Sequence, residues 1–470
     1  MRINGLMIDC SRLMERHAYY RRLLDFMADW GMNTLLWHFT DDHGVAVELP
    51  GFRNLAMPHA FTAREMRSLI RYAADRGIEV IPELETFGHT RYLTDRPEYE
   101  HLFAGRKTRR LLFDAIDPLN AESERLMARL MKATARVFSS DSLHVGCDEV
   151  ELADYCRTKG GLDAAQVWAG YVNRMIEQAK SIGKEPMIWG DHPKNDARIR
   201  QLLRKDVTVV DWCYWLKGRP PGVAKFVRAG FERVLVAPSL ACYGYRFLPT
   251  TTALENTRRM AQRGVRYGCD GLINTIWCPY RYVQGALYYG IAYSATVVSG
   301  NGRADRRAFN RVFSKRVFGT DLAAPLGRFL MDWPKLEITS RASAQLVKRR
   351  PDWDPANLAD LERVADIGRR ILPLAERYCP ARNADIWDAM LLAGQAAWLC
   401  AESVMIRRLR KPSAARRRTY NTFLKSVRKR LGETWDATRF PDSPQKRRTK
   451  FRGTEGQYAL ILIDRLRTVK

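Results

Sequence analysis

The sequence of 470 residues lacks several features that would place it in a common class of protein. It has no unbroken apolar run near the roughly 18 residues that cross a membrane. The N-terminal stretch 1–9 leads into a strand-like pattern and shows no signal-peptide regions. The nine cysteines form no CxxC pair and no Cys/His spacing typical of zinc sites. We therefore expect a cytoplasmic protein with reduced thiols, no membrane span and no cofactor.

One further absence, that of a nucleic-acid-binding motif, limits the alternatives. The net charge of +26, most of it carried by residues 301–470, favours acidic partners, but no nucleic-acid-binding motif accompanies the basic clusters at 348–350, 416–418 and 446–448. A solvated helical face explains these clusters most simply, so we expect no nucleic-acid partner. Association with nucleic acid or a membrane through this basic segment stays the alternative.

What the sequence does contain is a repeated unit in residues 1–300. A short apolar segment, a polar end and an amphipathic helix follow one another eight times. The apolar segments are 5–9, 33–38, 78–84, 143–147, 186–189, 207–212, 233–237 and 271–277. This alternation predicts an α/β fold, a (β/α)₈ TIM barrel. A doubly wound sheet is less favoured, because no Gly-rich phosphate turn follows the first segment.

The strand pattern disappears after residue 300. Helical patterns replace it at 308–317, 358–378, 384–410 and 414–431. We therefore predict two domains: a barrel carrying the catalytic site over residues 1–300, and a basic all-α domain over residues 301–470.

Polar and aromatic side chains gather where the predicted strands end. Asp148 and Glu149 follow the fourth apolar segment, at the end where such barrels place their chemistry. Alone, this pair would more often be explained as the N-cap and first turn of a helix. Carboxylates, Arg12 and several tryptophans at the other strand ends instead favour a sugar site, since aromatic faces stack on sugar rings. A metal site is disfavoured, because the first strand has no His-x-His pair.

Four ordered motifs resemble those of glycoside hydrolase family 20, the β-N-acetylhexosaminidases. Residues 144–149 (HVGCDE) resemble the H-x-G-G-D-E signature. Residues 7–12 (MIDCSR) resemble a first-strand D-x-x-R, and residues 37–44 (WHFTDDHG) a W-H-L-x-D-D-x-G segment. Residues 81–89 (IPELETFGH) are similar to I-P-E-I-D-x-P-G-H. The resemblance is close over residues 5–150 and looser beyond.

The resemblance implies a retaining, exo-acting hydrolase that uses its substrate's own 2-acetamido group as the nucleophile. Asp148 would orient that group, which forms an oxazolinium intermediate. Glu149 would protonate the leaving oxygen and then deprotonate water. Asp41 and His89 would form a supporting relay to Glu149.

The same resemblance implies the substrate-binding residues. Arg12 would bind the C3 and C4 hydroxyls of a terminal N-acetylglucosamine or N-acetylgalactosamine. Trp189, Trp212 and Trp277 would enclose the acetamido methyl group, and Tyr243 would bond its carbonyl. No metal ligand is implied.

Some positions depart from the family pattern. Cys147 replaces the second Gly of the signature, a change between small residues. The acid that often follows the strand-seven tyrosine is absent after Tyr243, and the strand-eight glutamate is absent after Trp277. These departures leave the choice between gluco and galacto sugars open. A glycan-binding barrel without turnover is therefore the first alternative function.

Overall fold

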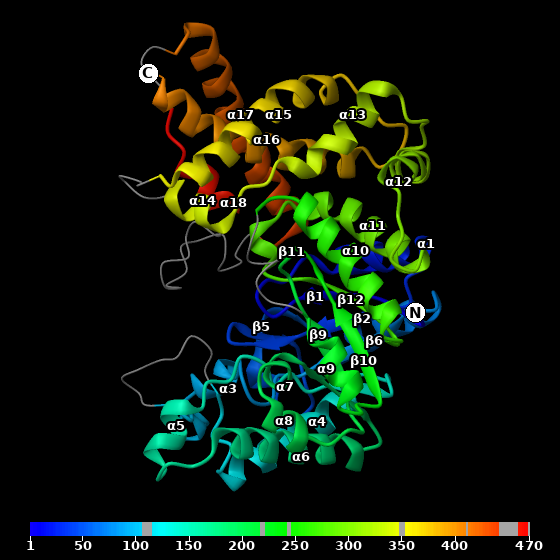
Figure 1. Ribbon diagram of the computed structural model, residues 1–470, viewed down its shortest axis with the longest axis vertical. Helices are drawn as coiled ribbons and strands as arrows, with labels where there is room; N and C mark the ends of the chain where they lie inside the picture. Colours follow the sequence, from blue (N-terminus) through cyan, green and yellow to red (C-terminus); the bar gives the residue numbers. More distant parts are fainter. Residues whose placement is uncertain are drawn as a thin grey trace. The chain divides into compact units, whose positions relative to one another are not determined.

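The structure of the chain is a computed structural model that describes residues 1–105, 115–216, 221–241, 246–346, 353–409, 412–440 and 459–468. The chain divides into two compact units. The first comprises Met1–Pro238 with Arg259–Thr275, and the second comprises Ser239–Arg258 with Ile276–Lys470. Figure 1 labels most of the helices and strands of both.

Eight parallel strands close into a barrel, which confirms the predicted fold class. Each strand pairs with the next, and β12 pairs back with β1 (Figure 1). Their bounds are β1 (Ile3–Asp9), β2 (Thr34–His38), β6 (Glu79–Glu83), β7 (Ser142–His144), β8 (Glu185–Trp189), β9 (Thr208–Trp212), β10 (Arg233–Ala237) and β12 (Gly271–Ile276). All eight coincide with predicted apolar segments, because strands covered on both faces are apolar throughout.

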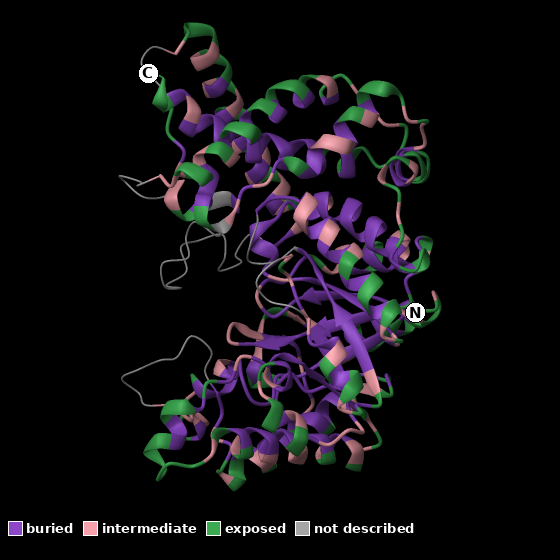
Figure 2. Cartoon of the chain, in the orientation of Figure 1, coloured by how far each residue is buried: buried purple, intermediate pink, exposed green. Residues whose placement is uncertain are grey.

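The register of the first four strands brings their last residues into one row. Asp9 pairs with His38, His38 with Glu83, and Glu83 with His144. All four residues are buried (purple strands in Figure 2). Since parallel strands in register direct paired side chains to the same face, the row places four titratable groups in one layer of the barrel.

Helices follow most of these strands. They are α1 (His17–Asp29), α2 (Ala63–Ala74), α3 (Arg91–Thr94), α4 (Ala121–Ala135), α5 (Ala153–Thr158), α6 (Ala164–Ser181), α7 (Asp191–Asn195), α8 (Ala197–Leu202), α9 (Val223–Arg228) and α10 (Thr251–Arg266). A capping box is present at the start of α2: Thr62 accepts from the Glu65 backbone, and the Glu65 side chain accepts from the Thr62 backbone.

A small second sheet was not predicted. It consists of β3 (Thr40–Asp41), β4 (Gly44–Val47) and β5 (Ala56–Phe61), and Asp41 pairs with Gly44 across an antiparallel turn. β3 has only two residues and β5 is partly exposed, so neither has the apolar run that marks the barrel strands. This turn fixes the backbone of Asp41 three residues beyond the end of β2.

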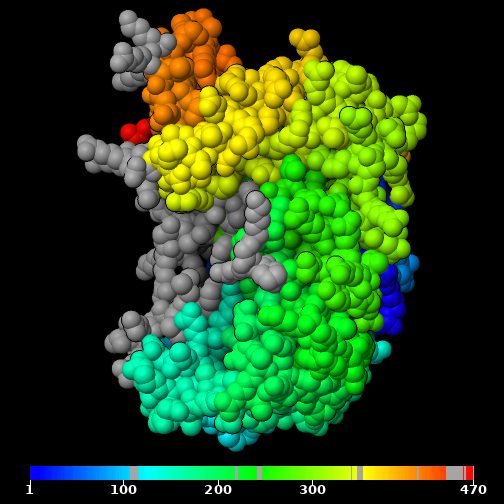
Figure 3. Space-filling view, in the orientation of Figure 1, coloured from blue at the N-terminus to red at the C-terminus, as the bar shows by residue number. Residues whose placement is uncertain are grey.

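The second unit is mainly helical. Besides β11 (Ser239–Ala241), it contains α11 (Leu287–Ser299), α12 (Arg306–Phe313), α13 (Ala324–Asp332), α14 (Ser340–Leu346), α15 (Pro355–Ala375), α16 (Ala384–Arg408), α17 (Ala414–Thr438) and α18 (Ala459–Asp464). Figure 3 shows the surface of α12 to α17 in yellow-green to orange. No strand follows β12 in the ranges described above. The domain limits at residue 300 stay a prediction.

One helix of this unit, α16, is long and apolar enough to cross a membrane by length and composition. It has 25 residues and a mean hydropathy of 1.5 over the relevant window, of which 94% is buried inside the protein. A core helix passes the same test. Glu402 within it is buried and contacts Arg369 at 2.7 Å and Arg416 at 2.5 Å. Such charged residues interrupt its apolar runs, which is why the sequence showed no unbroken run.

Candidate active site

The backbone turns sharply after β7. Gly146, Cys147 and Glu149 have φ angles of 66°, 75° and 53°, all in the left-handed region. The His144 ring accepts a hydrogen bond from the Gly146 N–H at 3.1 Å through Nδ1. A Cβ on Gly146 would lie 1.9 Å from a Glu85 carboxyl oxygen, so only glycine fits there. This turn carries Asp148 and Glu149 out of the strand.

His89 joins the two carboxylates to the predicted relay. Its Nε2 lies 3.5 Å from Glu149 Oε2 and 3.8 Å from Asp148 Oδ2, and its Nδ1 lies 3.5 Å from Asp41 Oδ2. Burial alone would lower the pKa of His89, but the Asp41 and Asp148 carboxylates raise it well above its ordinary value. The structure therefore brings three of the predicted residues, Asp41, Asp148 and Glu149, together around the imidazole of His89.

Asp41 is the other centre of contacts. Its carboxylate lies 2.7 Å from Arg12 Nη2, 3.1 Å from His38 Nε2 and 3.3 Å from His43 Nδ1. Burial opposes ionisation, yet Arg12 first and His89 second hold the pKa of Asp41 well below its usual range. Asp41 is therefore a buried, ionised group. Arg12, which also contacts Asp9 at 2.9 Å, is oriented by two carboxylates.

His38 connects Asp41 to a further group of buried side chains. His38 Nδ1 contacts Glu83 at 3.0 Å, and the Trp189 indole N–H donates to Glu83 at 2.6 Å. Trp189 is 0% exposed, so its ring lies within the barrel interior in this structure. Burial lowers the pKa of His144 to about 4, so that ring is neutral and free to accept from Gly146.

The carboxyl group of Asp148, in the same turn, has a strongly raised pKa. Burial raises its pKa to about 8, against the opposing effect of His89, and the Asp191 and Glu149 carboxylates raise it further. Only 7% of the residue is exposed. Its ionised form therefore needs a hydrogen-bond donor or a positive charge, of the kind an amide N–H of a bound ligand would supply.

The other predicted aromatic residues, Trp212, Tyr243 and Trp277, lie in different parts of the chain. Trp212 is half-buried at the end of β9, with Lys194 Nζ 4.7 Å from its ring centroid and Tyr214 at 5.1 Å. Tyr243 lies outside the described residues. Trp277 follows β12 but belongs to the second unit. The roles of Trp212 and Trp277 in enclosing the acetamido methyl, and of Tyr243 in bonding its carbonyl, stay predictions.

Comparison with known proteins decides the family. The family model described as Glycosyl hydrolase family 20, catalytic domain, matches residues 3–259, more than half of the chain. The chain belongs to glycosyl hydrolase family 20. This confirms the resemblance drawn from the four motifs.

Individual relatives of this family-20 chain are distant. Beta-hexosaminidase subunit beta of Homo sapiens is 27% identical over 262 residues, which are 51% of this chain and 46% of that protein. A β-N-acetylhexosaminidase structure from Bacteroides fragilis has 21% identity and a TM-score of 0.54, covering 67% of this chain and 69% of that one. A chitobiase structure from Flavobacterium johnsoniae has 15% identity and a TM-score of 0.52, covering 90% and 74%. Both structures share the fold. The sequence match spans less than half of the human relative.

Among the described residues of this family-20 barrel, three groups of side chains are close enough to hold a metal ion. They are His38 with Glu83 and Glu85, Asp41 with Asp42 and His89, and His89 with Asp148 and Glu149, each with atoms within 4.8 Å. In the first group both ring nitrogens of His38 already contact carboxylates, Asp41 and Glu83. The proximity of these side chains is therefore also explained by a hydrogen-bonded network without a metal. The absence of a metal stays a prediction.

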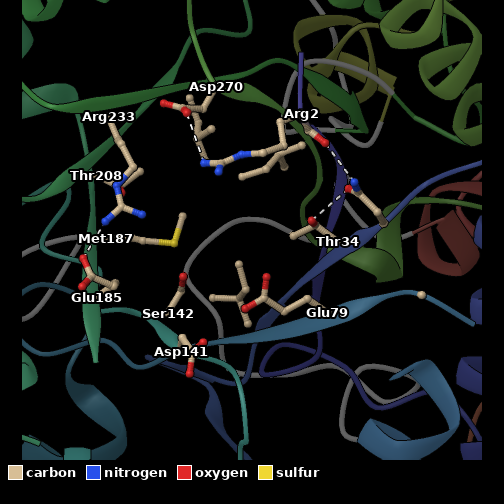
Figure 4. Close-up of a pocket in the computed structure, with 15 residues that line it drawn as sticks. Arg2, Thr34, Glu79, Asp141, Ser142, Glu185, Met187, Thr208, Arg233 and Asp270 are labelled. Atoms are coloured by element: carbon tan, nitrogen blue, oxygen red, sulfur yellow. Dashed lines mark hydrogen bonds and ion pairs between the residues drawn. The ribbon is translucent and has the colours of Figure 1, made fainter. Parts of the chain in front are cut away.

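A cavity of about 550 Å³ lies at the other end of the barrel. Residues at the starts of strands line it, among them Thr34, Glu79, Ser142 and Glu185 (Figure 4). None of the predicted site residues is among its lining residues. This end of such barrels serves stability, whereas chemistry occupies the carboxyl ends of the strands.

Sequence analysis gave no role to four residues that the structure places in the site. His38 and Glu83 link Asp41 to Trp189, and Asp191 and His192 contact the turn that carries Glu149. Their position at strand ends was the available signal. Most of their partners could not be inferred, because every contact except that of His38 with Asp41 joins segments distant in the sequence.

Proposed function

We propose that this protein is an exo-acting β-N-acetylhexosaminidase, which removes terminal β-linked N-acetylglucosamine or N-acetylgalactosamine from glycans or glycoconjugates. The observation that carries the proposal is the position of His89, within 3.8 Å of Asp41, Asp148 and Glu149, in a family-20 chain. This arrangement provides an acid–base group, an orienting carboxyl and a charged relay between them.

The reaction retains anomeric configuration and uses the substrate's acetamido oxygen as its nucleophile. That oxygen attacks the anomeric carbon while the bond to the leaving oxygen breaks and Glu149 gives its proton to the leaving oxygen. An oxazolinium ion results. Water then attacks the same carbon, Glu149 takes the water proton, and the acetamido group is restored. No enzyme carboxylate bonds to the sugar, so the usual rule on the separation of two carboxylates does not apply.

Asp148 acts on the nitrogen of the acetamido group. Its raised pKa, about 8 because of burial, means that the carboxyl is largely protonated near neutral pH without a ligand. The amide N–H, which gains positive charge as the oxazolinium ion forms, stabilises the ionised carboxylate at that moment. Asp148 therefore favours the transition state over the bound substrate, which is how binding groups accelerate chemistry.

Arg12 and two tryptophans bind the sugar in this proposal. Arg12 is 11% exposed at its side chain and is oriented by Asp9 and Asp41, so its outer N–H groups suit hydroxyls at C3 and C4. Trp212 and Trp277 enclose the acetamido methyl and Tyr243 bonds the carbonyl, while the fully buried Trp189 takes part through its hydrogen bond to Glu83 and not through contact with the sugar.

Turnover of a chromogenic N-acetyl-β-glucosaminide and its galacto epimer tests the activity. A thiazoline that mimics the bicyclic intermediate should inhibit strongly, because it resembles the transition state more than the substrate does. The matched control is a glucoside with a 2-hydroxyl group, which should not turn over. A covalent enzyme adduct trapped by a 2-fluoro glycoside, together with indifference to the thiazoline, would overturn this mechanism.

We also propose a cytoplasmic location. Eight cysteines fall in the described ranges, seven of them buried, and all eight are free thiols. A reducing compartment suits such thiols. Fractionation of cells that express the full-length protein tests the location, and recovery from the medium would contradict it.

A further inference from the structure

The catalytic turn has a backbone that needs support. Glu149 has φ 53°, a left-handed conformation that is strained for a non-glycine residue and persists only where neighbouring groups hold it. The carboxylate of Glu149 is 35% exposed at its side chain and lies 3.5 Å from His89. Because few neighbouring groups hold a side chain this exposed, its direction depends largely on the conformation of its own backbone.

The support comes from the segment that follows β8, the next strand of the barrel. Asp191 Oδ2 accepts the Glu149 N–H at 3.0 Å, and His192 Nε2 accepts the Val150 N–H at 3.0 Å. Both acceptors belong to the first turn of α7, which follows β8 directly. Two adjacent residues thus bind two adjacent backbone N–H groups.

This pair of acceptors is itself held in place. Asp191 is 8% exposed, and the His192 ring packs on Trp168 with centroids 4.9 Å apart and an interplanar angle of 30°. Trp168 is 1% exposed in the core. Because Nε2 accepts from Val150, the proton of a neutral His192 ring is on Nδ1. The His192 ring is therefore held in one orientation by its packing against the buried Trp168 ring.

We infer that Asp191 and His192 are positioning residues for the catalytic acid: they hold the Glu149 backbone in the left-handed conformation that directs its carboxylate toward His89 and the leaving oxygen. This inference rests on the proposed function of Glu149. It assigns neither residue any contact with the substrate.

Two disruptive and two conservative variants test the inference in the full chain. Asp191→Ala and His192→Phe remove an acceptor, whereas Asp191→Asn and His192→Gln keep an oxygen that can accept the same N–H. We expect the disruptive variants to lose about 10- to 100-fold in kcat with little change in KM, since a displacement of about 1 Å costs that order of rate. The conservative variants should recover most of the loss. Asp191→Asn also separates the hydrogen bond from the negative charge that Asp191 places near Asp148.

A double-mutant cycle with Glu149→Gln distinguishes positioning from general stability. If Asp191 acts through Glu149, adding Asp191→Ala to Glu149→Gln costs no further activity, because the acid is already absent. The loss from Asp191→Ala should also be greater for poor leaving groups, which need protonation. Additive losses in the cycle, or full activity of both disruptive variants, would overturn the inference. An inactive wild type, or a Glu149→Gln variant as active as the wild type, would instead contradict the proposed function.

Should Asp191→Ala not fold, His192→Phe supplies the same cycle independently, since it removes the bond to Val150 only. Thermal unfolding of each variant gives the folded fraction, to which kcat is normalised.

Discussion

Gly88 offers a sharp test of how closely the site is packed. It lies between β6 and α3, one residue before His89, and its φ is not in the left-handed region. Alanine can therefore adopt its backbone conformation. The obstacle is space: a Cβ on Gly88 would lie 2.3 Å from the Asp148 carbonyl oxygen and 3.2 Å from Val150 Cγ2.

The size of the effect of Gly88→Ala follows from these distances. Carbon and oxygen atoms in ordinary contact are about 3.3 Å apart or more, so the methyl group or the Asp148 backbone has to move by roughly 1 Å. A shift of this size in a catalytic group costs about 100-fold in rate. Overpacking of this kind also costs about 1–3 kcal/mol of stability. We expect kcat/KM to fall about 100-fold, with a lower Tm.

The assay compares Gly88→Ala with a matched glycine elsewhere in the same unit. Gly170 lies within α6, where a Cβ would meet only Arg174 Nη1 at 3.7 Å. Gly170→Ala should keep wild-type kcat/KM and raise Tm slightly, because alanine favours helix. Rates on a chromogenic N-acetyl-β-glucosaminide, normalised to folded protein, give the comparison. A Gly88→Ala enzyme with wild-type kcat/KM would refute the packing of Gly88 against the Asp148 backbone.

Three further predictions concern the carboxylates and the basic segment. Glu149→Gln should lower turnover about 10²- to 10⁴-fold, and less for good leaving groups; wild-type rates on an unactivated disaccharide would contradict its role. Asp148 has a pKa raised to about 8 from an ordinary 3.8, so its contribution to stability is present below about pH 4 and is lost as the pH rises through about 8. Asp148→Asn should therefore raise Tm relative to the wild type more at pH 8 than at pH 5, while kcat falls; an equal difference at both pH values would contradict the buried, neutral carboxyl. Nucleic-acid binding by the full chain should vanish at moderate salt, and tight binding at physiological salt would promote a nucleic-acid role.

The barrel was predictable because its strands leave a strong local signal. Parallel strands buried on both faces are continuous apolar runs, and each was followed by an amphipathic helix or a loop. The sheet that fixes Asp41 left no such signal, since β3 has only two residues. The same distinction applies to the site. The chemistry of Asp148 and Glu149 follows from residue type and order, but their neighbours are set by register and by loops, which join segments more than 40 residues apart.

Trp189 illustrates what residue type alone does not provide. Sequence analysis placed it among three tryptophans around an acetamido group, yet its ring is 0% exposed and its N–H donates to Glu83. The depth of a side chain at a strand end depends on where the strand stops relative to its neighbours, and β8 extends two residues beyond the paired row that ends β7.

Cys147 shows how the departure from the family signature is accommodated. A left-handed φ of 75° favours glycine, which has no Cβ to clash with the backbone, and cysteine adopts it here at a cost of about 1–2 kcal/mol. The thiol recovers part of this cost, because it is fully buried, donates to the Val145 carbonyl at 3.2 Å and lies 3.5 Å from the Thr86 hydroxyl. The conformation therefore belongs to the turn and not to the residue: the contacts of Gly146 with His144 before it, and of Glu149 with Asp191 after it, fix the backbone on both sides of Cys147. A small side chain that can hydrogen-bond within that turn is therefore accommodated at the position where the signature has its second glycine.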